Sequence, residues 1–294
     1  MDIIQKHRSK DEVKQRSKRV LAIHDLSSFG HTSLMAIIPI LYSRGIQVCA
    51  LPTALLSSNT CYEDYVMQDT TDLMQSMPLH WVKLGLEFDA IYSGFLGSPV
   101  QANIVNDLIS KYRTESTLII VDPVLADDGK LYSCYDEQMV DAMKTPLHRA
   151  DIITPNFTEA CLLTNTVYRL DPDEPCIRDI CTKLAEQGPR HIVITSIPGS
   201  DPRQTHIAYY NTITQYFQLY PCDYMPCFYP GTGDVFTTVL LADVLNGIPL
   251  ELAIPNARDF VFNAIKLSLD VDSPHQEGLC LDIVLNQSGG FYVR

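Results

Sequence analysis

The fold is decided by residues 19–53, "RVLAIHDLSSFGHTSLMAIIPILYSRGIQVCALPT". An apolar run over residues 19–25 ends in polar residues, and a second apolar run covers residues 46–53. Between them, residues 31–45 have a helical pattern that ends at Gly45, and glycine commonly follows the last turn of a helix. Short continuous apolar runs are typical of strands buried on both faces. The stretch therefore predicts a strand–helix–strand unit with two parallel strands.

The same alternation continues along the chain. Further apolar runs cover residues 88–94, 116–124, 150–156 and 190–196, and helical patterns cover residues 98–112 and 157–164. Apolar strands that alternate with helices are the pattern of an α/β fold with a mainly parallel sheet. We therefore predict that fold class for the larger part of the chain.

The pattern changes after the last of these runs. Residues 205–211 and 213–221 alternate between apolar and polar side chains, which predicts an antiparallel hairpin. Two helices are expected next, one from Asp234 and one over about residues 251–269. Residues 286–293, "NQSGGFYV", suggest a final short strand.

Composition excludes several classes of protein. The 294 residues carry 22 Lys and Arg against 35 Asp and Glu, a net charge of −13, so no general attraction to nucleic acid or anionic lipid is expected. No apolar run is long enough for a membrane span, and residues 1–18 lack the apolar core of a secretory signal. The nine cysteines form no C-x-x-C pair and are expected to be reduced thiols. These features predict a cytoplasmic protein in which a polar, disordered leader (1–18) precedes a single domain (19–294).

Polar residues follow the predicted strands at their carboxyl ends. The pairs and triplets are His24-Asp25, Ser93-Gly94, Asp122-Pro123, Thr154-Pro155-Asn156 and Thr195-Ser196. The carboxyl ends of parallel strands lie at one edge of a sheet, where open α/β proteins bind their ligands. Five such ends therefore predict one shared site.

A glycine-rich segment precedes the helix expected from Asp234. It reads "YPGTGDVF" over residues 229–236. Glycines let successive N–H groups converge, and a helix N-terminus adds the positive end of its dipole, so the segment predicts an anion cradle. Asp234 has two interpretations: a helix cap worth about 1 kcal/mol, or a general base that takes a proton from a substrate hydroxyl during phosphoryl transfer. The chain has neither a P-loop nor a G-x-G-x-x-G fingerprint.

Several motifs together resemble the ribokinase superfamily. "GTGD" before an apolar helix resembles its anion hole, and "TPNFTEA" (154–160) resembles its N-x-x-E magnesium motif. "VDPVLADDGKLY" (121–132) resembles a segment of its vitamin kinases, and "VITS" (193–196) resembles their nucleotide-side strand end. "LAIHDLSSFGH" (21–31), "LSSNT" (56–60) and "YSGFLGS" (92–98) are similar to the pyridoxal/pyridoxamine kinase branch. The resemblance covers about residues 20–269 and implies a three-layer αβα sandwich without a separate lid domain.

The resemblance implies an activity and a set of site residues. The activity is ATP-dependent phosphorylation of the 5′-hydroxymethyl group of a B6 vitamer (pyridoxal, pyridoxamine or pyridoxine). Asp234 matches the catalytic base, and Gly231, Thr232 and Gly233 match the anion hole. The matches on the vitamin side are Asp25, Thr60 and Phe95. The matches on the ATP side are Asp122, Asp127, Tyr132, Asn156, Thr195 and Ser196, with Thr232 and Gly233. For cations, Asn156, Glu159 and Asp122 match the Mg²⁺ region, and Thr154 matches a site for a monovalent ion such as K⁺. The resemblance also implies a homodimer.

Alternatives remain open at several of these positions. Asn156 and Glu159 can simply form a capping box at a helix start, and Phe95 can be a core residue. Asp25 stands where many pyridoxal kinases have serine, so it can pair with a protonated ring nitrogen, favour an amine-bearing vitamer or change the substrate. For the whole chain, the alternatives are a hydroxymethylpyrimidine kinase of the same fold and a non-catalytic vitamin-binding homologue.

Overall fold

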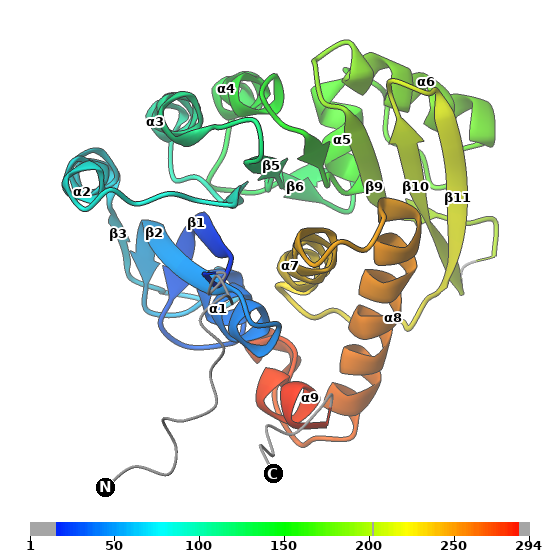
Figure 1. The fold of residues 1–294 in the computed structure, drawn as a ribbon. Helices are drawn as coiled ribbons and strands as arrows, with labels where there is room; N and C mark the ends of the chain where they lie inside the picture. Colours follow the sequence, from blue (N-terminus) through cyan, green and yellow to red (C-terminus); the bar gives the residue numbers. More distant parts are fainter. Residues whose placement is uncertain (1–15, 202, 288–294) are drawn as a thin grey trace, which may run out of the picture.

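A computed structural model describes residues 16–201 and 203–287, and a nine-stranded sheet runs through its centre (Figure 1). Its strands are β1 (Arg19–Ser27), β2 (Gln47–Leu56), β3 (Met67–Asp69), β4 (Ala90–Ser93), β5 (Leu118–Val121), β8 (Ile152–Ile153), β9 (His191–Pro198), β10 (Gln204–Asn211) and β11 (Tyr216–Asp223). Across the sheet the order is β11-β10-β9-β8-β5-β4-β1-β2-β3. A separate small hairpin joins β6 (Ala126–Asp127) to β7 (Lys130–Leu131).

The centre of the sheet is parallel and its edges are antiparallel. Strands β2, β1, β4, β5, β8 and β9 pair in parallel in that order. The hairpin β10–β11 adds two antiparallel strands beyond β9, and the short β3 adds one beyond β2. The predicted α/β class and the predicted hairpin are both confirmed. In such a sheet the carboxyl ends of the parallel strands form one rim.

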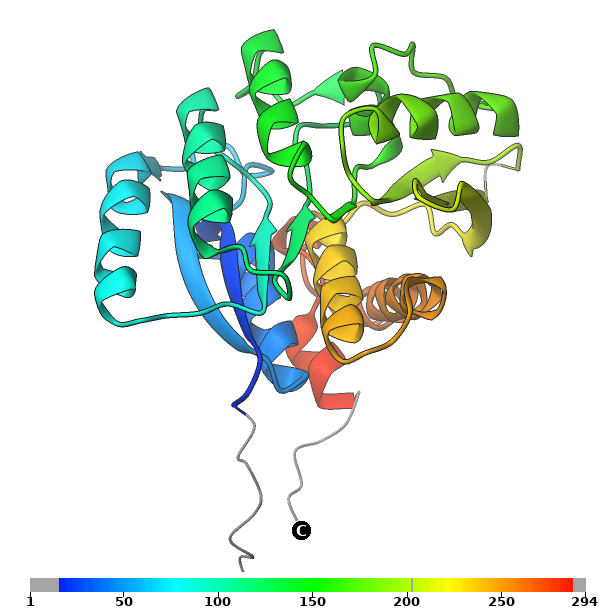
Figure 2. The ribbon, with the colours of Figure 1, turned by 45° about the horizontal axis from the view of Figure 1, so that its top comes forward.

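Helices cover both faces, which makes three layers (Figures 1 and 2). The helices are α1 (Ser33–Ser43), α2 (Thr71–Lys83), α3 (Pro99–Tyr112), α4 (Glu137–Leu147), α5 (Phe157–Leu163), α6 (Glu174–Ala185), α7 (Thr232–Leu245), α8 (Leu250–Leu269), α9 (Leu281–Gln287) and the 3₁₀ turn η1 (His275–Glu277). Leu21 and Ala22 of β1 show the layering, since adjacent strand residues point to opposite faces. Leu21 packs in the core under α2–α6, whereas Ala22 packs in the core under α1, α7, α8 and α9.

Helix α7 is deeply buried beside the site. Eleven of its fourteen residues are buried, and a helix that is apolar all round is normally enclosed by protein. It packs between α1 and α8 (Figure 1), and its first residue is Thr232, two residues before the predicted start at Asp234. Its N-terminus therefore occupies a fixed position beside the sheet rim.

Sequence patterns missed some elements and misplaced one. Helices α2, α4 and α6 were not predicted, and α2 and α4 each contain an internal proline that argues against a helix. The strand expected over residues 150–156 is only Ile152–Ile153. The final strand expected at residues 286–293 is wrong at its start, because Asn286 and Gln287 belong to α9, and its remainder lies outside the described residues. The leader predicted at residues 1–18 lies outside them as far as residue 15.

The helices and the cysteines can be compared with what the composition predicted. No helix within residues 16–201 and 203–287 is long and apolar enough to cross a membrane. The nine cysteines are free thiols, three of them buried.

Candidate active site

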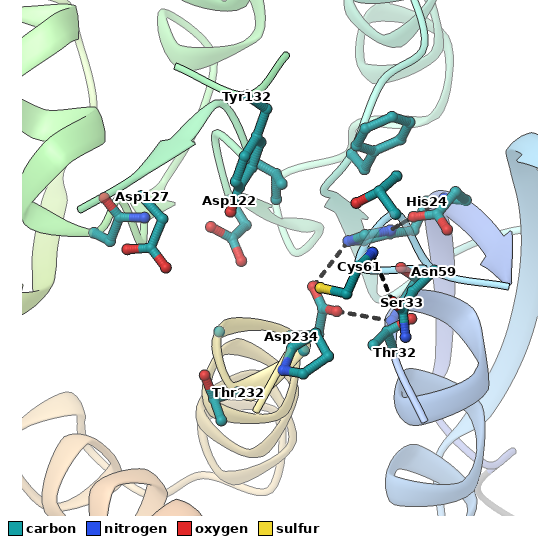
Figure 3. Close-up of a pocket in the computed structure, with 18 of the residues that line it drawn as sticks. His24, Thr32, Ser33, Asn59, Cys61, Asp122, Asp127, Tyr132, Thr232 and Asp234 are labelled. Carbon is teal, nitrogen blue, oxygen red and sulfur yellow. Dashed lines mark hydrogen bonds and ion pairs between the residues drawn. The ribbon is translucent and has the colours of Figure 1, made fainter. Parts of the chain in front are cut away.

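A pocket opens at the sheet rim, where the carboxyl ends of the parallel strands face the N-termini of α1 and α7 (Figure 3). It holds about 1120 Å³ of empty space, part of it open to solvent. Every site residue that the resemblance implied lines it: Asp25, Thr60, Phe95, Asp122, Asp127, Tyr132, Thr154, Asn156, Glu159, Thr195, Ser196, Gly231, Thr232, Gly233 and Asp234. Of the five polar strand ends expected to form the site, Ser93-Gly94 does not line this pocket.

Asp234 lies in the first turn of α7 but does not cap that helix. Its Oδ2 accepts a 2.7 Å hydrogen bond from the backbone N–H of Ser33, at the start of α1. Its Oδ1 lies 3.0 Å from Nε2 of His24, and the side chain faces the pocket. The carboxylate therefore meets the positive end of a second helix and an imidazole. The capping interpretation is wrong for α7, and a buried carboxylate is available at the centre of the pocket.

The backbone requires a glycine at Gly231 but not at Gly233. Gly231 has φ +83°, in the left-handed region, and a Cβ there would lie 3.0 Å from the Thr32 side chain. Gly233 has neither constraint, because a Cβ there would meet no protein atom within 4 Å. No side chain caps the helix at Gly231, so the first N–H groups of α7 have no acceptor within the helix. The N-terminus of α7 thus presents donors to open space, as an anion site requires.

His24 is buried between two carboxylates. It lies at the end of β1 with 2% of its surface exposed, and its Nδ1 is 2.9 Å from Oδ1 of Asp25. Asp25 is held on its other oxygen by the Ser27 hydroxyl at 3.0 Å. Burial opposes a charge on the ring, but the attraction of Asp234 and hydrogen bonds to both carboxylates outweigh it and raise the pKa of His24 to about 10. His24 was seen at a strand end in the sequence, but nothing there predicted its pairing with Asp234, 210 residues away.

Asp122 and Glu159 bring negative charge to the opposite side of the pocket. Burial, and then the Asp234 carboxylate, raises the pKa of Asp122 to about 7, while His24 acts in the opposite direction. Thr237 of α7 donates to Asp122 at 3.2 Å and lies 2.9 Å from the Thr154 hydroxyl. Burial, and then the Asp122 carboxylate, raises the pKa of Glu159. These buried acids repel one another, so a cation bound between them would be stabilised.

Asn156 and Glu159 form the capping box that the alternative interpretation expected. Asn156 Oδ1 accepts from the Glu159 backbone at 2.9 Å, and Glu159 Oε2 accepts from the Asn156 backbone at 2.8 Å. Glu159 Oε1 also accepts from Leu125 N–H at 2.9 Å, and the Asn156 amide donates to Ala126 at 2.7 Å. The pair therefore anchors the β6–β7 hairpin over the pocket, and a structural role is compatible with a position beside ATP.

The β6–β7 hairpin and a bulge in β9 supply the other predicted nucleotide-side residues. Asp127 lies on the hairpin, and Tyr132 follows it with 38% of its surface exposed. Thr195 bridges to Asn156 in parallel, and the next residue, Ser196, has φ +56°. The register with β10 shifts at this point, and bulges commonly redirect side chains next to active sites.

Phe95, predicted to contact the vitamin, is held in part by packing against another aromatic ring. Its ring is 8% exposed and stacks on Tyr135 at 5.6 Å, so one face belongs to the core. Thr60 and Asp25 also line the pocket. Other lining residues were given no chemical role from the sequence: His24, Thr32, Ser33, Asn59, Cys61 and Cys134. Ser33 contributes through its backbone, which no side-chain motif can indicate.

The residues present fit a hard divalent cation that arrives with a nucleotide. Within residues 16–201 and 203–287, no three His, Cys, Asp or Glu residues lie close enough to form a metal cage. The pocket instead offers the carboxylates of Asp122 and Glu159, both of which have raised pKa values. A bound cation would relieve the repulsion between their negative charges. Mg²⁺ prefers such a setting, with one or two carboxylates plus water and substrate phosphates.

Fold and site together define a ribokinase-like kinase. The chain belongs to the phosphomethylpyrimidine kinase family, whose model matches residues 38–278. It is 28% identical over 269 residues to a pyridoxine/pyridoxal/pyridoxamine kinase of Bordetella avium, covering 86% of each chain. It is 26% identical over 261 residues to a hydroxymethylpyrimidine/phosphomethylpyrimidine kinase of Haemophilus influenzae, covering 88% of this chain and 94% of the relative.

A solved structure is closer in sequence. A Bacteroides thetaiotaomicron protein assigned to the phosphomethylpyrimidine kinases and crystallised with pyridoxal is 39% identical, with a TM-score of 0.89. The match covers 95% of this chain and 98% of that one. These findings confirm the predicted fold, the kinase class and the predicted pyridoxal kinase branch of the ribokinase superfamily.

Proposed function

We propose that the protein transfers the γ-phosphoryl group of ATP to the 5′-hydroxymethyl group of a B6 vitamer. One observation carries this proposal: the buried Asp234 carboxylate faces the pocket directly beside the uncapped N-terminus of α7. A base next to an anion cradle is what phosphoryl transfer to an alcohol needs, because little else has to be supplied by the protein.

The step uses these groups as follows. Asp234 accepts the proton of the substrate hydroxyl as its oxygen attacks the γ-phosphorus. The bond from that phosphorus to the bridging β–γ oxygen breaks, and ADP leaves with the electron pair. The N–H groups at Thr232, Gly233 and Asp234 stabilise the charge on the transferring group, since donors fixed in place need no reorganisation during the reaction. Gly233 keeps this position open, because it has no other structural reason to lack a side chain.

Cations complete the proposed site. We assign Mg²⁺ to the region of Asp122 and Glu159, with Asn156 orienting Glu159 through the capping box. When bound with ATP, the ion neutralises phosphate charge. Thr154, whose hydroxyl contacts Thr237, is the proposed neighbour of a monovalent ion such as K⁺. Nucleotide contacts are assigned to Asp127, Tyr132, Thr195 and Ser196, which line that end of the pocket.

The vitamin is placed at the other end, against Asp25, Thr60 and Phe95. A flat heterocycle suits a wall that contains an aromatic ring. The relative crystallised with pyridoxal and the Bordetella kinase favour a B6 vitamer. The Haemophilus relative and the matched family model favour hydroxymethylpyrimidine as the second candidate.

Domain organisation, oligomeric state and cellular compartment are also part of the proposal. We propose that residues 19–294 act as one domain, that the protein forms a homodimer and that it works in the cytoplasm. The unpaired state of the nine thiols supports a reducing compartment. Light scattering after size exclusion measures the oligomeric state, and a monomer at micromolar concentration contradicts the homodimer.

Parallel ATP-consumption assays with Mg²⁺ test the function. The assays compare the wild type, Asp234→Asn and a control variant, Asp72→Asn, which changes an exposed residue of α2. Each is offered pyridoxal, pyridoxamine, pyridoxine and hydroxymethylpyrimidine. We expect turnover on a B6 vitamer and a loss of about 10²–10⁴-fold in Asp234→Asn, with Asp72→Asn unchanged. Turnover only on the pyrimidine supports the second candidate. Tight vitamin binding without ATP consumption supports a non-catalytic protein.

A further inference from the structure

His24 links two carboxylates that the proposed function treats separately. Its Nε2 lies 3.0 Å from Asp234 Oδ1, and its Nδ1 lies 2.9 Å from Asp25 Oδ1 (Figure 3). Both carboxylates line the same pocket. The three side chains therefore form a continuous chain from the end of β1 to the first turn of α7.

The protein makes specific room for this ring. Gly94, just after β4, has its Cα so close to His24 that a Cβ would lie 2.0 Å from the ring Cδ2 and 2.2 Å from Nε2. Tyr92, two residues earlier, meets the imidazole edge to face with ring centres 6.2 Å apart. Any side chain at Gly94 would displace the ring from Asp234, so β4 fixes the position of the imidazole.

The groups around His24 decide its charge. Asp25 on β1 and Asp234 on α7 contact the ring through their carboxylates. Asp122 after β5, whose pKa burial raises to about 7, adds negative charge above that pH. Tyr92 on β4 is neutral, since burial raises the pKa of its hydroxyl. The backbone N–H of Asp25 also lies 3.0 Å from Nδ1 and offers a bond to a neutral ring. A neutral ring carries one proton and can donate to only one of the two carboxylates, whereas a cation donates to both.

We propose that Asp25, His24 and Asp234 act as one unit, in which Asp25 holds His24 as a cation and His24 orients the Asp234 carboxylate. His24 is a positioning residue, because it acts on the reaction through Asp234. Asp25 then acts through His24 rather than only on the vitamin ring. The inference rests on the proposed function, in which Asp234 is the base.

The first test compares the pH dependence of turnover. His24→Gln can still donate a hydrogen bond to Asp234 but carries no charge. We expect kcat to fall about tenfold or more near neutral pH, with the KM for the vitamer changed less than threefold. The loss should be full near neutral pH and should shrink as the pH approaches 10, because the wild-type ring itself loses its charge there. The control is His80→Gln, which changes an exposed histidine of α2.

A merely structural role for His24 gives a different result. It predicts an equal loss of kcat at every pH, and that finding overturns the inference. If Asp234→Asn keeps full turnover, the proposed base itself is wrong. If Asp234→Asn is inactive and His24→Gln is normal, only the further inference fails.

A double-mutant cycle tests whether Asp25 works through His24. Asp25→Asn should lower kcat in the same direction as His24→Gln, and the double variant should be little worse than the more damaged single variant, since the residues share one chain of contacts. Additive losses overturn the inference, as does an Asp25→Asn that changes only the KM for the vitamer. Both results leave Asp25 as a ring contact.

Two readouts avoid changing the titrating residues. Gly94→Ala should reproduce the His24→Gln profile by displacing the ring, whereas Gly97→Ala, where a Cβ has ordinary contacts at 3.4 Å or more, should not. In ¹⁵N-histidine NMR of the wild type at pH 8, both ring nitrogens of His24 should carry protons. A neutral ring with bare Nδ1 at that pH overturns the proposed charge.

Discussion

Gly231 and Gly233 are adjacent to one threonine and share the anion cradle, yet their alanine variants should fail in opposite ways. Gly231 has φ +83°, and its Cβ would lie 3.0 Å from the Thr32 side chain and 3.1 Å from the His31 carbonyl oxygen. Gly233 has neither a positive φ nor a protein atom within 4 Å of a Cβ. Gly231→Ala should therefore lose stability, and Gly233→Ala should lose activity.

The size of the first effect follows from the backbone. Holding alanine in the left-handed region costs about 1–2 kcal/mol, and the close contact with Thr32 adds to it, so we expect a loss of about 2–3 kcal/mol. At about 2.1 cal/mol/K of unfolding entropy per residue, that loss lowers Tm by roughly 3–5 °C for a chain of this length. Gly233→Ala should keep Tm or raise it slightly, because alanine is the better helix former.

Calorimetry and ATP consumption at saturating vitamer measure the two effects on the same samples. We expect Gly233→Ala to lose tenfold or more in turnover, since its methyl group narrows the space in front of the α7 N–H groups. A Gly233→Ala variant with normal kcat and KM for ATP refutes the view that this glycine keeps the cradle open. A Gly231→Ala variant as stable as the wild type refutes the strain argument.

Three further predictions concern stability and substrate binding. The pKa of His24 is about 10 in the folded protein against 6.5 in the unfolded chain, so the stability that its charge contributes is full below pH 6.5 and lost as the pH rises through 10. In urea titrations, the difference in unfolding free energy between wild type and His24→Gln should therefore shrink with rising pH by at most about 5 kcal/mol. A difference that stays constant with pH contradicts this. Arg44→Ala should cost about 3 kcal/mol by urea unfolding without changing kcat, because among the described residues it leaves the buried Asp243 carboxylate only the amide of Asn256 as a side-chain partner; an unchanged midpoint contradicts that. Phe95→Leu should raise the KM for the vitamer and leave that for ATP unchanged, and equal changes in both would place Phe95 in the general core.

The local sequence was sufficient for the fold class and for most site residues. Strands such as β1 and β9 are continuous apolar runs, and the parallel arrangement follows once helices alternate with them. Because parallel strands end at one rim, polar residues at those ends could be assigned to one pocket before any contact was known. Helices with weak apolar patterns or internal prolines, such as α2, were missed for the same reason, since their stability comes from packing.

The way in which the Asp234 carboxylate is held became visible only in the folded structure. The sequence shows that an acid follows two glycines at a helix start, a pattern that fits a cap as well as a base. The answer depends on His24 and on the Ser33 backbone, which are more than 200 residues away. The ring also needs the empty space at Gly94 on another strand. Hydrogen bonds and charges act over a few ångströms in space, so no local pattern can record partners that only the folded sheet brings together.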